Sequence, residues 1–164
     1  MTAWTRPLPP GSRRSDAAPS LTMPTVEMTF TPLPAHVRTA RLVATAVARR
    51  SGVPEALLDE VRLAVGEACS RAVEVHQEHC PAEPVRVALT GAGERFEVVV
   101  TNTAAGGDGM AWPPQPVPEE QDSVAAPAEL GLAVIAGLAD DVQVSRNGDG
   151  LSIRMSWPSG APAN

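Results

Sequence analysis

Residues 66–76, GEACSRAVEVH, carry the side chains whose types and spacing suggest chemistry. Glu67 and Arg71 are four residues apart, so on a helix they lie one turn apart on the same side. A carboxylate held in a pocket can serve as a general base. The same carboxylate beside an arginine on an exposed helix is an ordinary ion pair, worth ~0.3–0.5 kcal/mol. The elements around this stretch must separate the two interpretations.

Two further groups in the same region suggest chemistry less strongly. His76, His79 and Cys80 could share one end of a helix, but a structural zinc site requires four ligands. Cys69 lies about two turns earlier and is not expected to reach them, so we predict a polar helix end and no metal. Cys69 and Ser70 are potential nucleophiles without a histidine or aspartate at a recognisable spacing. We expect Cys69 to be a small residue near the edge of the core.

The composition indicates one globular domain and a protein partner. The chain has 164 residues, of which 43% are hydrophobic and only 3% aromatic, so its core must consist of Val, Leu, Ile and Ala. A net charge of −6 opposes contact with nucleic-acid phosphates, which makes direct nucleic-acid binding unexpected. No apolar run reaches the ~18 residues of a membrane span. Two cysteines form no disulfide framework, so we expect a reduced, cytoplasmic setting.

The order of predicted elements begins with an extension and ends with a hairpin. Residues 1–24 contain five prolines and no apolar leader, so we expect a disordered extension rather than a signal peptide. A strand is predicted at 26–30, a helix at 35–51 that ends at Gly52, and a long helix at about 54–79. Strands at 85–90 and 95–100 flank a GAGE turn, and a long lid-like loop covers 101–128. A helix at 129–139 and two strands around an NG turn complete the domain, and residues 159–164 form a tail.

This order predicts an α+β fold for residues 25–158. Antiparallel strands interrupted by helices favour a two-layer sandwich, in which helices cover one face of a mixed, mostly antiparallel sheet. The order resembles the histidine-kinase-like (GHKL, Bergerat) ATPase fold, and in particular the RsbW-type anti-sigma factor serine kinases, over about residues 23–157. The motifs that carry the resemblance are LDEVRLAVGEACSRAV and ELGLAVIAGLADDV. In that family the long helix usually reads LAVSEAVTNAVEHA, the first hairpin ends in DxGxG and the last helix opens in GRGLxLI.

The resemblance implies a pocket for ATP and magnesium, and it places Glu67 and Arg71 at two of the pocket's positions. Glu67 falls on the family's general base and Arg71 on the asparagine that holds magnesium. Asparagine offers a neutral carbonyl oxygen to a hard dication, whereas arginine has only donors and a fixed positive charge. Arg71 therefore cannot ligate magnesium, although it could contact phosphate. Glu67 is then a vestigial base.

Two other elements of the family's pocket are also altered. Asn102 replaces the aspartate that accepts a hydrogen bond from adenine, Ala104 replaces the first glycine of DxGxG, and Gly106 keeps the second. Gly131 remains at the last helix, but Glu129 adds negative charge where phosphate would lie. We therefore predict a degenerate ATP pocket of Arg71, Asn102, Gly106 and Gly131, with no bound metal.

The function implied by the resemblance is partner switching. The leading hypothesis is a binding module that holds an RNA polymerase sigma factor, a STAS-domain anti-anti-sigma factor or both, as a monomer or a homodimer, without kinase activity. The alternative is an active serine/threonine kinase that phosphorylates its STAS partner with ATP and magnesium, and a third hypothesis is a sensor of another small molecule. The 101–128 loop lies where the family has its ATP lid. It is either a solvated connection or a partner-contacting segment with Trp112 as its anchor.

Overall fold

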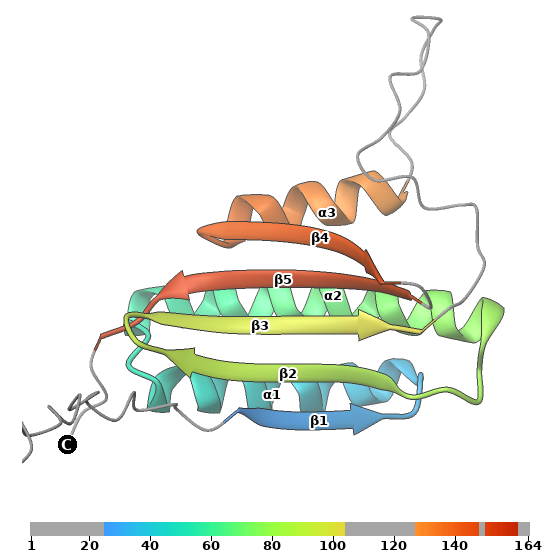
Figure 1. Ribbon diagram of the computed structural model, residues 1–164, viewed down its shortest axis with the longest axis horizontal. Coiled ribbons are helices and arrows are strands. Elements are labelled where there is room, and N and C mark those ends of the chain that lie inside the picture. The colour runs from blue at the N-terminus through green and yellow to red at the C-terminus, as the bar shows by residue number, and fades with distance from the viewer. Residues whose placement is uncertain (1–24, 104–126, 148–149, 161–164) are drawn as a thin grey trace, which may run out of the picture.

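The computed structural model describes residues 25–103, 127–147 and 150–160, and the remaining residues lie outside this description. The expectations for residues 1–24, for Ala104, Gly106 and Trp112, and for residues 161–164 therefore lie outside the described residues. Figure 1 shows the elements in chain order. They are β1 (Val26–Phe30), α1 (Pro34–Arg50), a 3-10 turn (Glu55–Leu57), α2 (Leu58–His79), β2 (Val85–Ala92), β3 (Arg95–Asn102), α3 (Pro127–Leu138), β4 (Asp141–Asn147) and β5 (Gly150–Pro158).

The strands form one five-stranded sheet in the order β1-β2-β3-β5-β4. All four pairings between neighbouring strands are antiparallel, so the sheet is purely antiparallel rather than mixed. The register places Val87 opposite Val100 and places Val100 opposite Ile153, so that apolar side chains from three strands share one face. That face is the one the alternating sequence pattern predicts to be buried.

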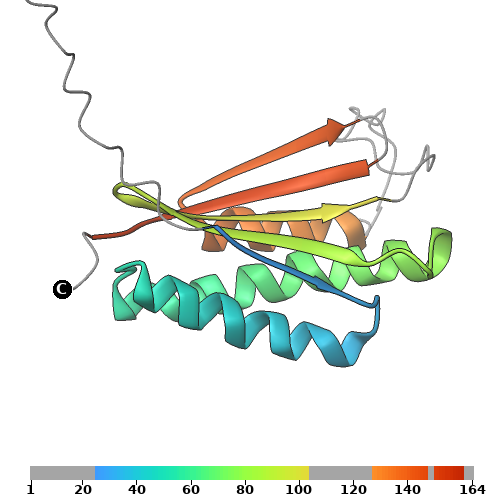
Figure 2. The ribbon, with the colours of Figure 1, turned by 60° about the horizontal axis from the view of Figure 1, so that its bottom comes forward.

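The helices cover this apolar face, as the two-layer prediction requires. Figure 2 shows α1, α2 and α3 on the same side of the sheet, and among the described residues no helix covers the other side. Buried alanines of α1 and α2 contribute to the core, and their small side chains allow close packing of these helices. These alanines are Ala40, Ala44 and Ala48 of α1 and Ala64, Ala68 and Ala72 of α2. The α+β sandwich predicted from the sequence is confirmed.

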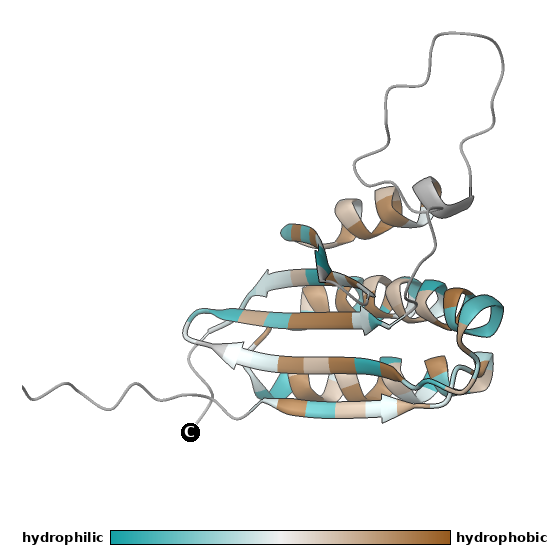
Figure 3. Ribbon diagram, turned by 45° about the vertical axis from the view of Figure 1, so that its right-hand side comes forward, coloured by the Kyte–Doolittle hydropathy of each residue, from teal (hydrophilic) through white to brown (hydrophobic). Residues whose placement is uncertain are grey.

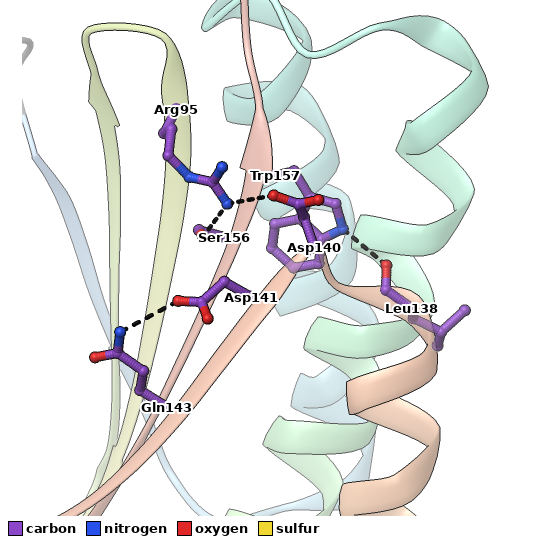
Figure 4. A network of polar contacts seen from close by, with 7 residues as sticks. All are labelled: Arg95, Leu138, Asp140, Asp141, Gln143, Ser156 and Trp157. Atoms are coloured by element: carbon purple, nitrogen blue, oxygen red, sulfur yellow. Dashed lines mark hydrogen bonds and ion pairs between the residues drawn. The ribbon is translucent and has the colours of Figure 1, made fainter.

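Polar contacts fix the end of α3 against the sheet (Figure 4). The fully buried Trp157 of β5 donates its indole N–H to the carbonyl oxygen of Leu138 at 2.9 Å, which satisfies one of the last main-chain acceptors of α3. Two residues further on, Asp140 accepts a hydrogen bond from Arg95 of β3 at 2.7 Å. The same Arg95 nitrogen donates to Ser156 of β5. These contacts set the position of α3 relative to β3 and β5.

The structure moves several predicted boundaries. Gly52, with a φ of 81°, ends the first helix as expected, because glycine adopts this left-handed conformation without strain. The long helix begins at Leu58, after the 3-10 turn, rather than at 54. Residues 101 and 102 belong to β3 and residues 127 and 128 to α3, so the loop is shorter than expected. Gly160 donates its main-chain N–H to the carbonyl oxygen of Gly52, so the chain after β5 contacts the end of α1.

Candidate functional site

Arg71 is a buried side chain, not half of an exposed ion pair. Only 7% of its surface is exposed, and it lies on the side of α2 that faces α3. Burial lowers the pKa of Arg71, while the nearby carboxylates of Glu67 and Glu74 act in the opposite direction. A guanidinium remains charged in such surroundings, so this site contains a fixed, partly compensated positive charge. The predicted surface ion pair of Glu67 with Arg71 is therefore wrong about its exposure, because α3 covers the arginine.

Gly131 is the residue of α3 that lies directly on this pair. A Cβ atom at position 131 would collide with the Glu67 carboxylate and would lie 2.6 Å from Nη1 of Arg71. It would also lie 3.0 Å from Cδ of Arg71. Glycine at this position therefore allows α3 to pack against the two side chains of α2. In this structure Gly131 approaches protein side chains, in the place where the resemblance puts a phosphate-binding helix start.

Asn102 is the last residue of β3, and only 8% of its surface is exposed. Its side-chain Oδ1 accepts a hydrogen bond from the main-chain N–H of Leu151 at 3.1 Å. Leu151 is also the residue opposite Asn102 in the β3–β5 register. This side-chain hydrogen bond adds to the main-chain pairing between β3 and β5.

The space between these residues is small. A cavity of about 10 Å³ lies between α2 and the sheet, enough for about one water molecule. Pockets that bind small organic ligands in proteins typically have volumes of some hundreds of Å³. The cavity between α2 and the sheet is lined by Ala68, Arg71, Ala72, Val100, Asn102, Leu151 and Ile153. The structure thus brings Arg71 and Asn102 to one cavity, and it brings Glu67 and Gly131 together with Arg71 beside it.

His76 anchors the C-terminal end of α2, a role that the sequence pattern did not reveal. Its ring is fully buried, and Nε2 accepts a hydrogen bond from the main-chain N–H of Thr103 at 3.2 Å. Because Nε2 is an acceptor, Nδ1 carries the proton and donates it to the carbonyl oxygen of Glu83 at 2.8 Å. Both ring nitrogens are therefore occupied by main-chain groups. The zinc interpretation of His76, His79 and Cys80 has no support in this geometry, and the described residues contain no cluster of metal ligands.

Cys69 is a structural residue. Its side chain is fully buried on α2, and burial raises the pKa of the thiol to about 12. A thiol with this pKa is almost entirely protonated at neutral pH, and the protonated form is a poor nucleophile. The sequence-based expectation of a small core residue is confirmed, although Cys69 lies inside the core rather than at its edge.

Comparisons with known proteins agree with this fold. The family model of the histidine kinase-like ATPase domain matches residues 30–157. Among solved structures, the crystal structure of the RsbU and RsbW domains of Rv1364c from Mycobacterium tuberculosis superimposes with a TM-score of 0.58 and 16% sequence identity. The match covers 84% of this chain and 34% of the other, so this chain spans about a third of the length of the chain in that structure. No curated protein matches the sequence.

The family follows from the extent of the match. The matched segment begins at the end of β1 and continues to Trp157 of β5, so it includes all three helices and the hairpins of the sheet. The described part of the chain contains no helix long and apolar enough to cross a membrane. The chain belongs to the histidine kinase-like ATPase domain family.

Proposed function

We propose that this protein is a partner-switching regulator that acts by protein contact and not by phosphoryl transfer. Its partners would be an RNA polymerase sigma factor, a STAS-domain anti-anti-sigma factor or both, in the cytoplasm. The observation that carries the proposal is the buried Arg71, which fills the space between α2, α3 and the sheet. The fold shared with an RsbW domain supports the class of partner.

The described residues do not fit ATP and magnesium. Arg71 has no lone pair to offer a metal ion and carries a charge that repels one. Asn102 directs its Oδ1 atom at the Leu151 N–H, and the cavity that Arg71 and Asn102 line has a volume of about 10 Å³, enough for about one water molecule. We therefore propose that release of the partner is governed by competition between proteins or by modification of the STAS protein by another kinase.

Glu67 is the observation that favours the alternative function. It remains half-buried beside the pocket, at the position that the resemblance assigns to the general base. An active serine/threonine kinase would require Arg71 to leave the pocket. The alternative therefore predicts a second arrangement of α3, in which Gly131 no longer lies on Arg71.

The two functions are separated by measuring complex formation and phosphoryl transfer in parallel. The purified chain is mixed with the sigma factors and STAS-domain proteins of its source genome after treatment with apyrase, with magnesium and ATP, or with EDTA. We expect one class of partner to bind with the same affinity, within about two-fold, under all three conditions. Transfer of labelled phosphate to a STAS protein that is lost in Glu67→Ala, and kept in the exposed control Glu78→Ala, would refute the proposal.

A pair of variants tests the reason for the missing nucleotide site. Arg71→Asn removes the charge and enlarges the cavity, but it leaves the Asn102 amide bound to β5. We expect ATP affinity only in the double variant Arg71→Asn/Asn102→Asp, measured by calorimetry with magnesium. Strong ATP binding by the unmodified chain would contradict the proposed function directly.

A further inference from the structure

The outer side of α3 is the most unusual surface of the described domain. Between Leu130 and Leu138 no side chain of this helix is charged, and Figure 3 shows it in brown and tan. The inner side packs through Gly131, Leu132 and Ile135, which are buried. On the outer side Leu130 and Val134 are 51% and 49% exposed. A helix that is apolar on all sides is normally buried on all sides, so the described residues supply only half of the cover expected for α3.

α2 contributes a third exposed apolar side chain to the same surface. The two helices run antiparallel (Figure 1), and they touch where Gly131 lies on Glu67 and Arg71. Leu63 lies one turn before Glu67, and Val134 lies almost one turn after Gly131, so both are displaced in the same direction from this contact. Leu63 is 50% exposed. Leu63, Leu130 and Val134 together are called the apolar ridge below.

The border of the apolar ridge on α2 is acidic. Glu60, Glu67 and Glu74 recur at intervals of seven residues, which keeps them on one side of the helix that carries Leu63. Glu74 is exposed, and Glu60 and Glu67 are half-buried. The guanidinium of Arg71, beside Glu67 and Glu74, is buried beneath this stripe. Three carboxylates against one guanidinium give the border a net negative charge.

We propose that the apolar ridge and its acidic border are a docking surface for a basic amphipathic helix of a partner protein. Such a helix places apolar residues spaced three and four apart on Leu63, Leu130 and Val134. Arginine or lysine side chains along its flank would face the glutamates of α2 and supply specificity and a fast association rate. A second copy of this chain is a poor occupant, because it would bring its own acidic border and a net charge of −6 to the same surface. The inference rests on the proposed function, since it names the chemistry of the partner.

The test uses synthetic peptides and the full chain. Three labelled peptides of equal length are compared: an amphipathic helix with Leu on one face and Arg on its flanks, the same helix with Glu in place of Arg, and a scrambled Leu/Arg sequence. We expect only the first to bind with measurable fluorescence anisotropy, and its affinity to fall between about 50 and about 300 mM salt. Leu130→Glu and Val134→Glu should each weaken binding by about 30-fold or more. Glu60→Gln should weaken it by a few-fold.

Matched controls exclude general effects of the substitutions. Leu33→Glu changes an apolar residue that is 47% exposed and precedes α1, and Glu78→Gln changes an exposed glutamate at the end of α2. Both should bind like the unmodified chain. Far-UV circular dichroism and thermal unfolding verify that every variant is folded. Equal binding of the three peptides, or binding unchanged by Leu130→Glu and Val134→Glu, would overturn the proposal.

Two outcomes separate this inference from the function on which it rests. If a sigma factor or STAS protein binds and the ridge variants bind it equally well, the docking surface is wrong while the proposed function stands. If the basic peptide binds the ridge but neither class of protein forms a complex, the surface stands and the proposed function fails. Self-association of the unmodified chain in sedimentation that Leu130→Glu abolishes would identify a second copy as the occupant and overturn the basic helix.

Discussion

Substitution of two glycines on α3 tests whether the helix is packed on Arg71. Gly131 lies on the Glu67 and Arg71 side chains, whereas a Cβ at Gly137 would meet no atom within 4 Å. Alanine is preferred over glycine in a helix by about 0.5–1 kcal/mol, so Gly137→Ala should raise the free energy of unfolding by that amount. Gly131→Ala has the same gain but forces the buried arginine to move, at a cost of about 1–3 kcal/mol. The free energy of unfolding of Gly131→Ala should therefore be lower than that of Gly137→Ala by about 1–3 kcal/mol.

A double-mutant cycle assigns this difference to one side chain. In an Arg71→Ala background the Nη1 and Cδ contacts are gone, and the half-buried Glu67 can turn toward solvent. Gly131→Ala should then be about as stabilising as Gly137→Ala, with a coupling energy of about 1–3 kcal/mol between positions 71 and 131. Equilibrium unfolding in urea, followed by far-UV circular dichroism, measures all four stabilities, provided that the m-value stays constant. A Gly131→Ala variant as stable as Gly137→Ala would refute the packing described for α3.

Three further predictions concern other buried polar groups. Asn102→Leu leaves a β5 main-chain N–H without its acceptor, so the free energy of unfolding measured in urea should fall by about 1–3 kcal/mol. Asn102→Asp keeps an acceptor and should lower the free energy of unfolding by less. Equal losses of stability in the two variants would contradict the role of Oδ1. His76→Phe removes the acceptor of the Thr103 N–H, so hydrogen exchange at Thr103 should accelerate, and unchanged protection would show that the ring does not hold this residue. Folding raises the pKa of Cys69 from 9.0 to about 12, so its contribution to stability is complete below pH 9 and is lost as the pH rises toward 12. The chain contains no tyrosine or lysine to titrate in this window, and the pKa of Cys80 is raised as well. Cys69→Ala should therefore reduce the alkaline loss of stability, which unfolding at pH 8–11 would measure. An equal loss in the variant would exclude the Cys69 thiol as its cause.

The fold was predictable because its signals are local. Gly52 after two arginines ends α1, and the apolar spacing of α2 and α3 places each helix on the sheet. Alternation in β2 and β3 identifies the buried face of the sheet. Each of these patterns lies within one element, where a period of two or of 3.6 residues determines which side is buried. The least accurate limits were those of the long loop, where β3 extends to Asn102 and α3 begins at Pro127.

The geometry of the site could not be predicted, because it depends on elements that are far apart in the sequence. Helical spacing puts Arg71 on a stripe with Glu67 and Glu74, and such stripes are usually solvated. Its burial arises only when α3, which begins more than fifty residues later, places a glycine on that stripe. His76 likewise stood in an apparent group of metal ligands. Its partners Glu83 and Thr103 come from two other segments, so neither could be inferred from the spacing.

Arg71, Asn102 and Gly131 come from three different elements and lie close together in the fold. Arg71 and Asn102 line the same small cavity, and Gly131 closes over Arg71 from α3. An aspartate at position 102 would place a second buried charge in this cavity, whereas the neutral amide satisfies the β5 main chain without one. Arg71, Asn102 and Gly131 thus belong to one arrangement of α2, α3 and the sheet, and we expect the stability of the domain to depend on that arrangement.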